Sequence, residues 1–442
     1  MSRYALILAA GRGERLWPLT STRPKPLLPL PDGQSIISRL IRQVYYLVDG
    51  VVVVVSNDIY GELVRKELTK TSLPVMYAVQ HEKRGTAAAI EAGLKKLPRS
   101  VDEVLIIHGD LFVDNNIFKL IDKHTPPVLI GYQVSNPWEY GIILTEQGCL
   151  SDLLEKPEPS ILGEAPPLIN TGIYILERDL LGEAIDKVKP SKRGEYEATD
   201  ALKHIAQQKC IKVLHYDGFW IDIGRPWDLF SAYNFVLKTL IKNTNKSLIE
   251  GEVESYVEIK GPVVITKNAI IRSYTVVEGP AYIDGEVGPL ARVRPGTFLL
   301  ARSYVGSHTE VKNSILFSSA KAPHLNYVGD SIIGENVNLG AGTVTANLRF
   351  DHKTIKMLLK GRVVDSGLKK FGTVIGDYAQ TGVNVSILPG KRIGAYSWVY
   401  PGLVVSSDVP DCKMALPSPK RNEIEYIDIS KKARCPNYLA SP

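Results

Sequence analysis

The sequence predicts an α/β domain with a Rossmann-like, doubly wound sheet, followed by a parallel β-helix. Two patterns lead to this prediction. In the first half, short β-branched runs alternate with amphipathic stretches, and in the second half, aliphatic residues recur every six positions. The chain has 442 residues, of which 44% are hydrophobic and 23% charged, so we expect two or three folded domains and no wholesale disorder.

Strands and helices are expected to alternate along the first half. Residues 4–8 form the first expected strand, and residues 35–48 form a helix whose apolar side chains share one face. A helix over residues 226–242 begins at a proline and ends this domain, which we place at residues 1–245. Such βα units predict a parallel sheet that binds ligands at the carboxyl ends of its strands. The alternation continues over residues 51–56, 59–68, 75–80, 86–97, 104–107, 115–124 and 128–134.

The second half repeats every six residues. One inward-facing aliphatic residue per six, with glycines interspersed, is typical of a parallel β-helix of triangular section. An ordinary sheet is the alternative, because six is a multiple of the strand period of two, but so long a register is hard to obtain by chance. We place the β-helix at residues 246–410 and an irregular tail at residues 411–442. The period runs through Val253, Ile259, Ile265, Ile271, Val277 and Ile283, then Val287, Val293, Leu299, Val305 and Val311, and finally Ile375, Thr381, Ile387, Ile393, Val399 and Val405.

The composition excludes several classes of protein. No apolar run approaches the roughly 18–20 residues that span a bilayer, and charged residues interrupt any signal-peptide core. The net charge of +6 suits small phosphorylated ligands, but the sequence lacks the basic stripes with interleaved aromatic residues that nucleic-acid binders show. We expect a cytoplasmic protein without membrane or nucleic-acid partners. The cysteines form no C-x-x-C pair, so we expect isolated, reduced thiols at Cys149, Cys210, Cys412 and Cys435.

A glycine-rich stretch, Leu8-Ala9-Ala10-Gly11-Arg12-Gly13-Glu14-Arg15, follows the first expected strand directly. Glycines let backbone amides approach an anion closely, although a tight turn without a ligand uses similar residues. Further along, Lys25 stands between Pro24 and Pro26, which stiffen the backbone around one cation. Together the two segments predict an anion-binding site after the first strand.

These segments, L-A-A-G-x-G-x-R followed by P-K, resemble the signature of the sugar-1-phosphate nucleotidylyltransferases, which couple a nucleoside triphosphate to a sugar 1-phosphate and release pyrophosphate. The resemblance implies that Lys25 and Arg15 are catalytic. It also implies that Asp110, in His108-Gly109-Asp110, and Asp222, in Trp220-Ile221-Asp222-Ile223-Gly224, hold Mg²⁺. It further implies nucleotide contacts at Leu8, Ala10, Gly11, Gly13, Gln80, Gly85 and Thr86, and sugar contacts at Gly141, Glu155, Lys156 and Asn170.

The expected β-helix contains the segment His324-Leu325-Asn326-Tyr327-Val328-Gly329-Asp330. With residues 334–347, it resembles the acetyltransferase domain of the bifunctional N-acetylglucosamine-1-phosphate uridylyltransferase/glucosamine-1-phosphate N-acetyltransferases, in which a nucleotidylyltransferase domain comes first. The resemblance implies that His324 is the general base that takes the amine proton, a task that suits imidazole. It also implies substrate contacts at Arg294, Lys312, Tyr327, Asn338, Asn347 and Lys353, and acetyl-CoA contacts at Ala341 and Thr381.

The same resemblance implies a left-handed β-helix, a homotrimer, and UTP or dTTP, sugar 1-phosphates and acetyl-CoA as substrates. One alternative is a glucose-1-phosphate thymidylyl- or uridylyltransferase whose β-helix mainly serves assembly. Another is a regulatory subunit without catalysis, although Lys25, Asp110 and Asp222 are all present. The hexapeptide period is interrupted over residues 348–374, which resembles archaeal members of the family more than bacterial ones.

Overall fold

The computed structural model describes residues 2–71, 73–81, 83–161, 166–191, 194–244, 247–420 and 423–440. The chain divides into two compact units. The first comprises Met1–Arg12, Pro24–Leu27 and Ser35–Ile223, and the second comprises Gly13–Arg23, Leu28–Gln34 and Gly224–Pro442. The expected domain boundary falls on residues 245 and 246, which lie outside the described residues, so it stays a prediction. No helix in the described ranges is long and apolar enough to cross a bilayer.

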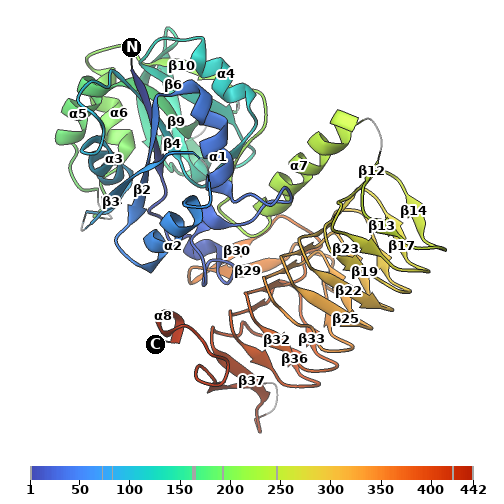
Figure 1. Cartoon of the computed structure of the whole chain (residues 1–442). Coiled ribbons are helices and arrows are strands. Elements are labelled where there is room, and N and C mark those ends of the chain that lie inside the picture. Colours follow the sequence, from blue (N-terminus) through green and yellow to red (C-terminus); the bar gives the residue numbers. More distant parts are fainter. Residues whose placement is uncertain are drawn as a thin grey trace. The chain divides into compact units, whose positions relative to one another are not determined.

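The first unit contains a nine-stranded sheet with the order β3-β2-β1-β4-β9-β6-β10-β8-β7 (Figure 1). The predicted parallel arrangement is confirmed for β1 to β4, whose β-branched runs are buried. A separate antiparallel pair joins β5 to β11. The strands are β1 Arg3–Leu8, β2 Gly50–Ser56, β3 Met76–Gln80, β4 Glu103–His108, β5 Leu111–Val113, β6 Val128–Gln133, β7 Gly141–Glu146, β8 Cys149–Glu155, β9 Leu168–Glu177, β10 Lys212–His215 and β11 Trp220–Asp222.

The sheet is mixed rather than parallel, which the sequence did not predict. Strand β9 runs antiparallel to both β4 and β6, and β7 and β8 form a hairpin. The hairpin turn places Gln147 and Gly148 at positive φ, as a two-residue turn requires. Because a hairpin needs no crossover helix, its strands fall outside the βα alternation that predicted the rest of the sheet.

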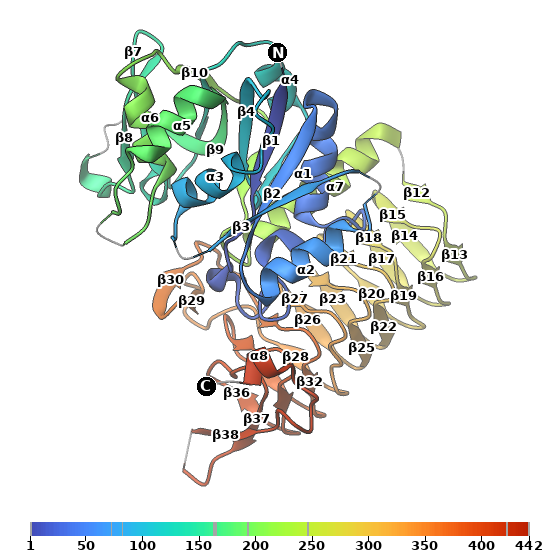
Figure 2. The same ribbon diagram turned by 60° about the vertical axis from the view of Figure 1, so that its left-hand side comes forward.

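Helices cover both faces of this sheet, as predicted. Helices α3, α5 and α6 pack their apolar residues into one core with the strands, and α1 and α4 lie on the opposite side (Figure 2). Ser35 caps α1, since its hydroxyl accepts a hydrogen bond from the Ser38 amide at 3.3 Å. The helices are α1 Ile36–Val44, α2 Ile59–Leu68, α3 Thr86–Leu94, α4 Asn116–Asp122, α5 Arg178–Asp186 and α6 Ala198–Ala206, with 3-10 turns η1 Glu14–Leu16, η2 Lys25–Leu27, η3 Tyr45–Leu47, η4 Pro137–Glu139 and η5 Pro159–Ile161.

The second unit contains the left-handed parallel β-helix, whose short strands stack coil upon coil in three sheets (Figure 1). The first sheet contains β12 Leu248–Ile249, β15 Val263–Ile265, β18 Ala281–Ile283, β21 Thr297–Leu299, β24 Ile315–Leu316, β27 Ile332–Ile333, β31 Val374–Ile375 and β34 Arg392–Ile393. The second contains β13 Glu252–Val253, β16 Ile270–Ile271, β19 Glu286–Val287, β22 Tyr304–Ser307 and β25 Lys321–His324. The third contains β14 Glu258–Lys260, β17 Val276–Glu278, β20 Arg292–Val293, β23 Glu310–Lys312, β26 Tyr327–Gly329, β28 Val344–Thr345, β33 Ser386–Ile387 and β36 Val404–Val405.

The six-residue period identified the core of the β-helix. From Ile265 to Val405, every aliphatic residue of the predicted register is buried in one continuous cluster. Val253, in the first coil, is 38% exposed because no earlier coil covers it. Burying one such side chain contributes about 1.5–3 kcal/mol, so the stack of buried aliphatic side chains is the main source of stability in this unit.

Three further segments complete the second unit. Helix α7 (Asp228–Thr244) begins two residues after Pro226, close to the predicted start. The interruption of the hexapeptide period contains an antiparallel hairpin of β29 (Lys356–Leu359) and β30 (Arg362–Asp365). The tail, expected to be irregular, extends the second-sheet side of the β-helix instead. The strands there are β32 Gln380–Thr381, β35 Trp398–Val399, β37 Lys413–Pro417 and β38 Ile424–Asp428, followed by α8 Asn437–Ala440.

The expectation of reduced cysteines is wrong. Cys149 pairs with Cys210 and Cys412 with Cys435, in each case as a disulfide. The paired cysteines are 61 and 23 residues apart in sequence, so the absence of a C-x-x-C motif does not exclude either disulfide. Cys149 begins β8 and Cys210 precedes β10, and backbone pairing of Lys212 with Cys149 holds the two segments together.

Reduction of the disulfides should lower the free energy of unfolding, because each bond restricts the unfolded chain. We expect the Cys149→Ser/Cys210→Ser variant to lose about 2–4 kcal/mol in denaturant titrations. The wild-type protein treated with a reductant should lose a similar amount. Equal unfolding midpoints with and without reductant would contradict the pairing.

Candidate functional site

The carboxyl edge of the parallel strands holds the glycine-rich loop. Leu8, the last residue of β1, is opposite His108 of β4 and Val54 of β2. Two backbone hydrogen bonds, from Ala9 N to Val54 O and from Gly109 N to Leu8 O, are both 2.8 Å long. A Cβ on Gly109 would come within 2.9 Å of Leu8 O, so the close approach of the two strand ends requires glycine there.

Strand pairing brings Asp110 and Asp222 together across more than a hundred residues of sequence. Strands β5 and β11 are antiparallel, and Asp222 is opposite Leu111, the residue after Asp110. The amide of Ile223 also donates to Asp110 O at 3.3 Å. The two carboxylates implied as metal ligands therefore lie at the same end of a short two-stranded ribbon.

Lys25 lies between these two carboxylates. Its Nζ donates to Asp110 Oδ2 and to Asp222 Oδ1, at 2.7 Å each, and the residue is only 5% exposed. Burial would lower the pKa of Lys25, but the charges of Asp110 and Asp222 outweigh it, so the pKa lies above its ordinary value. Burial would likewise raise the pKa of Asp110, but the Lys25 charge prevails and lowers it. Lysine and aspartate are thus both ionised at neutral pH.

The residues present suit a magnesium ion. Mg²⁺ is usually bound by one or two carboxylates together with substrate phosphate oxygens, and Asp110 and Asp222 supply that pair. No cluster of three or more acidic, histidine or cysteine residues that could hold a metal occurs in the described ranges. His108 Nε2, two residues before Asp110, is buried without a hydrogen-bond partner among the described residues.

The segments implied in nucleotide binding form an ordered turn. Gln80, at the end of β3, donates from Nε2 to the carbonyls of Lys83 and Gly85 at 3.0 Å each. Both amide hydrogens are thus used, and the carbonyl oxygen has no hydrogen-bond partner among the described residues. Gly85 has a φ of +105°, and a Cβ there would overlap the backbone of Tyr196. Thr86 accepts a hydrogen bond from the Ala198 amide at 2.8 Å, which ties the turn to α6.

The residues implied in sugar binding lie together on three neighbouring strands. Gly141 of β7 is opposite Glu155 of β8, and a Cβ on Gly141 would lie 3.2 Å from Glu155 Oε2 and 3.7 Å from Asn170. Asn170 Nδ2 donates to Tyr174 Oη at 3.2 Å, and its Oδ1 accepts from the Gly172 amide at 3.0 Å. Lys156 Nζ lies 3.6 Å from Glu155 Oε1. A carboxylate, an amide and a cation therefore lie close together here.

Gly13 and Arg15 belong to the second unit. Gly13 has a φ of +73° and its carbonyl accepts a hydrogen bond from the Thr20 hydroxyl at 2.9 Å. The guanidinium of Arg15 lies against Gly224, where a Cβ would come within 3.2 Å of it. Gly224 ends the Trp-Ile-Asp-Ile-Gly segment, so two of the sequence motifs meet at this point.

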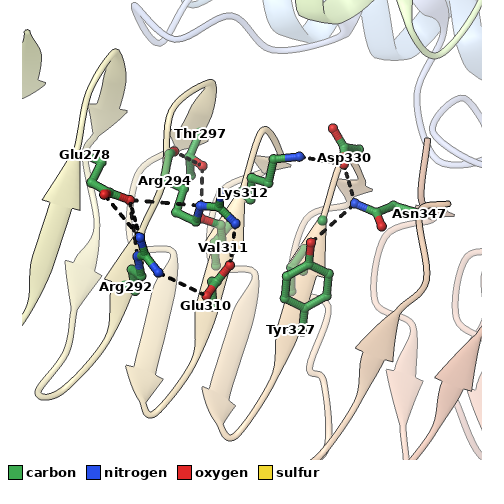
Figure 3. A network of polar contacts seen from close by, with 12 residues as sticks. Glu278, Arg292, Arg294, Thr297, Glu310, Val311, Lys312, Tyr327, Asp330 and Asn347 are labelled. Atoms are coloured by element: carbon green, nitrogen blue, oxygen red, sulfur yellow. Dashed lines mark hydrogen bonds and ion pairs between the residues drawn. The ribbon is translucent and has the colours of Figure 1, made fainter. Parts of the chain in front are cut away.

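Four of the nine residues implied in acetyl transfer, Arg294, Lys312, Tyr327 and Asn347, lie on or next to successive strands of the third sheet (Figure 3). Arg294 Nη1 contacts Glu310 at 2.9 Å, and Lys312 Nζ lies 3.4 Å from Asp330. Asn347 Nδ2 donates to Tyr327 Oη at 3.3 Å and also to Asp330. The face therefore presents two cations, a phenol and an amide in a row.

Asp330 is the central residue that the sequence interpretation missed. Asp330 is 4% exposed, and its carboxylate accepts hydrogen bonds from Lys312 and Asn347 (Figure 3). It also accepts one from Asn313 at 2.7 Å. It thereby holds the side chains of Lys312 and Asn347, which the resemblance implies in substrate binding. The sequence could have pointed to Asp330, because this residue ends the same motif, residues 324–330, that contains His324.

His324 lies on the other side of a sharp corner from Tyr327. It ends β25 and is exposed, its amide donates to Asn326 Oδ1 at 3.2 Å, and its carbonyl accepts from the Gly342 amide at 3.2 Å. Ala341, one coil further on, is therefore close to His324. The hydroxyl of Thr381 instead points into the coil, bonded to Thr343 at 2.8 Å. Asn338 is exposed beside Lys321, and Lys353 is exposed next to the hairpin.

Comparison with known proteins identifies the family. The nucleotidyl transferase family model matches residues 4–239. A bifunctional sugar-1-phosphate nucleotidylyltransferase/acetyltransferase of Sulfurisphaera tokodaii is 43% identical over 92% of this chain and 98% of its own length. The chain belongs to this bifunctional family. Another member, the bifunctional protein GlmU of Methanocaldococcus jannaschii, is 39% identical over 92% of this chain and 95% of its own.

Membership of the bifunctional nucleotidylyltransferase/acetyltransferase family confirms the resemblance noted in the sequence. It also confirms the enzyme class, a bifunctional nucleotidylyltransferase and acetyltransferase, and the nucleotidyl transferase match covers the α/β domain. The alternative of a non-catalytic regulatory subunit loses its support. The roles of individual residues remain predictions that rest on the geometry above.

Replacing Asp110 by asparagine should lower the free energy of unfolding at pH 7 by about 1–2 kcal/mol, because Lys25 loses a charged partner. The pKa of Asp110 is lowered, so its contribution is present above the ordinary carboxyl value and is lost as the pH falls. The difference between wild type and variant should therefore shrink between about pH 5 and pH 2 in denaturant titrations. Asp179→Asn, at a 93% exposed side chain, is the control. If the difference in unfolding free energy between wild type and Asp110→Asn grew as the pH fell, the ionised Asp110–Lys25 pair would be contradicted.

Proposed function

We propose that the α/β domain transfers the uridylyl group of UTP to N-acetylglucosamine 1-phosphate. The convergence of Lys25, Asp110 and Asp222 at the edge of the sheet carries this proposal. An oxygen of the sugar phosphate attacks the α-phosphorus, a new P–O bond forms, and pyrophosphate leaves. Lys25 and Arg15 offset the negative charge of the transferring group, while backbone amides of the glycine-rich loop, at Leu8, Ala10, Gly11 and Gly13, hold phosphate oxygens.

Other residues of this domain select the two substrates. The free carbonyl oxygen of Gln80 accepts a hydrogen bond from the nucleobase, and Gly85 and Thr86 line the nucleoside. Glu155, Lys156 and Asn170 bind sugar hydroxyls, and Gly141 leaves space for the ring. Asp110 and Asp222 would hold Mg²⁺, which would supply positive charge to offset that of the triphosphate.

We propose that the β-helix acetylates glucosamine 1-phosphate with acetyl-CoA, so that it makes the sugar used by the first domain. His324 takes a proton from the amine as nitrogen attacks the thioester carbon, and coenzyme A leaves as a thiol. Arg294 and Lys312 bind the phosphate, and Tyr327, Asn338, Asn347 and Lys353 bind the sugar. Ala341 and the backbone of Thr381 contact the pantetheine arm. A homotrimer formed through the β-helix and a cytoplasmic location complete the proposal.

Lys25→Ala and Asp110→Ala should each reduce pyrophosphate release from UTP and N-acetylglucosamine 1-phosphate by at least about 10³-fold, because charge stabilisation is lost. Acetyl transfer by the same variants should stay at the wild-type rate. Parallel assays with dTTP and glucose 1-phosphate measure selectivity. A clear preference for dTTP and glucose 1-phosphate would favour the thymidylyltransferase alternative.

His324→Ala should reduce thiol release from acetyl-CoA and glucosamine 1-phosphate by about 10²–10⁴-fold, as expected for loss of a general base. Pyrophosphate release should not change. His215→Ala, at an exposed histidine of β10, serves as the control. Retention of the wild-type acetylation rate by His324→Ala would overturn the assignment of the base.

A further inference from the structure

A short stretch of the N-terminal region is held by the coils of the β-helix. The chain leaves the first unit after Arg12 and re-enters it at Pro24, and residues 13–23, here called the anchor segment, belong to the second unit. Leu16 and Leu19 within this segment are fully buried, and Ser21 is 4% exposed. At one end the segment continues into the glycine-rich loop, and at the other into Lys25.

Asp411 binds the middle of the anchor segment. Its carboxylate accepts hydrogen bonds from Trp17 Nε1 at 2.9 Å and from the Ser21 hydroxyl at 2.9 and 3.1 Å. The amide of Ala395 donates to the same carboxylate at 2.6 Å, so Asp411 is itself fixed to the neighbouring coil. All of these donors are neutral.

Asp377 and Glu335 bind the end of the segment nearest Lys25. Arg23 Nη2 lies 2.7 Å from Glu335 Oε2 and also pairs with Asp377, whose side chain is completely buried. The hydroxyl of Thr22 donates to Asp377 as well, and the Glu335 amide donates to its other oxygen at 2.7 Å. A buried pair of this kind holds one geometry, since moving Arg23 would leave Asp377 without its charged partner.

Shape complementarity adds to these polar contacts. The guanidinium of Arg392 lies 4.5 Å from the centre of the Trp17 ring and pairs with Asp408 at 2.6 Å. Pro18 packs against Gly376, where a Cβ would come within 2.9 Å of the proline ring. The anchor segment therefore fits a glycine-lined corner of the last coils.

We propose that Asp411, together with Asp377 and Glu335, positions Lys25 and Arg15 for nucleotidyl transfer by holding the anchor segment. Arg15 lies within the segment, and only Pro24, with its fixed φ, separates Arg23 from Lys25. These carboxylates touch neither substrate nor reacting atoms. The proposal rests on the proposed function of Lys25, and it makes the last coils of the β-helix necessary for the chemistry of the first domain.

Asp411→Ala is the most informative substitution, because it removes the anchor without leaving an unpaired cation. Displacing a catalytic group by about 1 Å costs up to about 10²-fold in rate, so kcat for nucleotidyl transfer should fall about 10–100-fold. The KM for UTP should change less than kcat, since Gln80 and Thr86 are untouched. The acetyl-transfer rate should stay within about 2-fold of wild type, which shows that the coils remain folded. Asp428→Asn, at an exposed aspartate paired with Lys413 in the same tail, is the control.

A double-mutant cycle tests whether Asp411 acts through the anchor segment. Trp17→Phe removes the indole N–H but keeps an aromatic ring over Arg392, and it should lower kcat in the same way as Asp411→Ala. The double variant should be no slower than the slower single variant, because both changes remove one contact. Additive losses in the cycle would overturn the proposed route.

Hydrogen exchange separates failure of this proposal from failure of the proposed function. Amides of residues 13–23 should exchange faster in Asp411→Ala and Trp17→Phe than in wild type or Asp428→Asn. Unchanged exchange in Asp411→Ala would show that Asp411 does not hold the segment. Faster exchange with wild-type kcat would overturn the positioning role alone. A wild-type protein that releases no pyrophosphate from any nucleotide and sugar phosphate would contradict the proposed function, and with it the positioning role.

Discussion

Backbone pairing between short strands fixes the positions of the two candidate metal ligands and of several candidate substrate contacts in this protein. Asp222 reaches Asp110 only because β11 pairs with β5, and Gly141 reaches Glu155 through the β7–β8 ladder. In the β-helix, the register of β20, β23, β26 and β28 aligns the polar row from Arg294 to Asn347. The register of the strands therefore decides which of these side chains lie close together.

Buried carboxylates serve as the second layer of organisation. Asp330 holds Lys312, Asn313 and Asn347 on the third sheet, and Asp377 and Asp411 hold the anchor segment. Each of them is satisfied by several donors, as a buried charge requires. Rigid placement of this kind suits catalysis, because flexible side chains would have to be ordered at the moment of reaction.

The sequence predicted those parts of the structure that repeat or alternate. The six-residue period located the buried aliphatic ladder, and the βα alternation located β1 to β4, because both patterns reflect burial on one face. It failed where structure depends on distant pairing. Strand β9 and the Cys149–Cys210 disulfide are held by partners far along the chain. The motifs named Lys25, Asp110 and Asp222, but the bonds between them became visible only in the structure.

The stacked coils also set a fixed spacing between side chains on the third sheet. Neighbouring strands in a sheet are about 4.8 Å apart, and Arg294, Lys312 and Tyr327 come from three successive coils (Figure 3). A molecule that reaches from the first to the third must therefore extend about 10 Å, so its size is set by whole turns of the backbone. Gaining or losing one turn between them would change that reach by about 4.8 Å, so the number of turns between the three residues sets the spacing of their side chains.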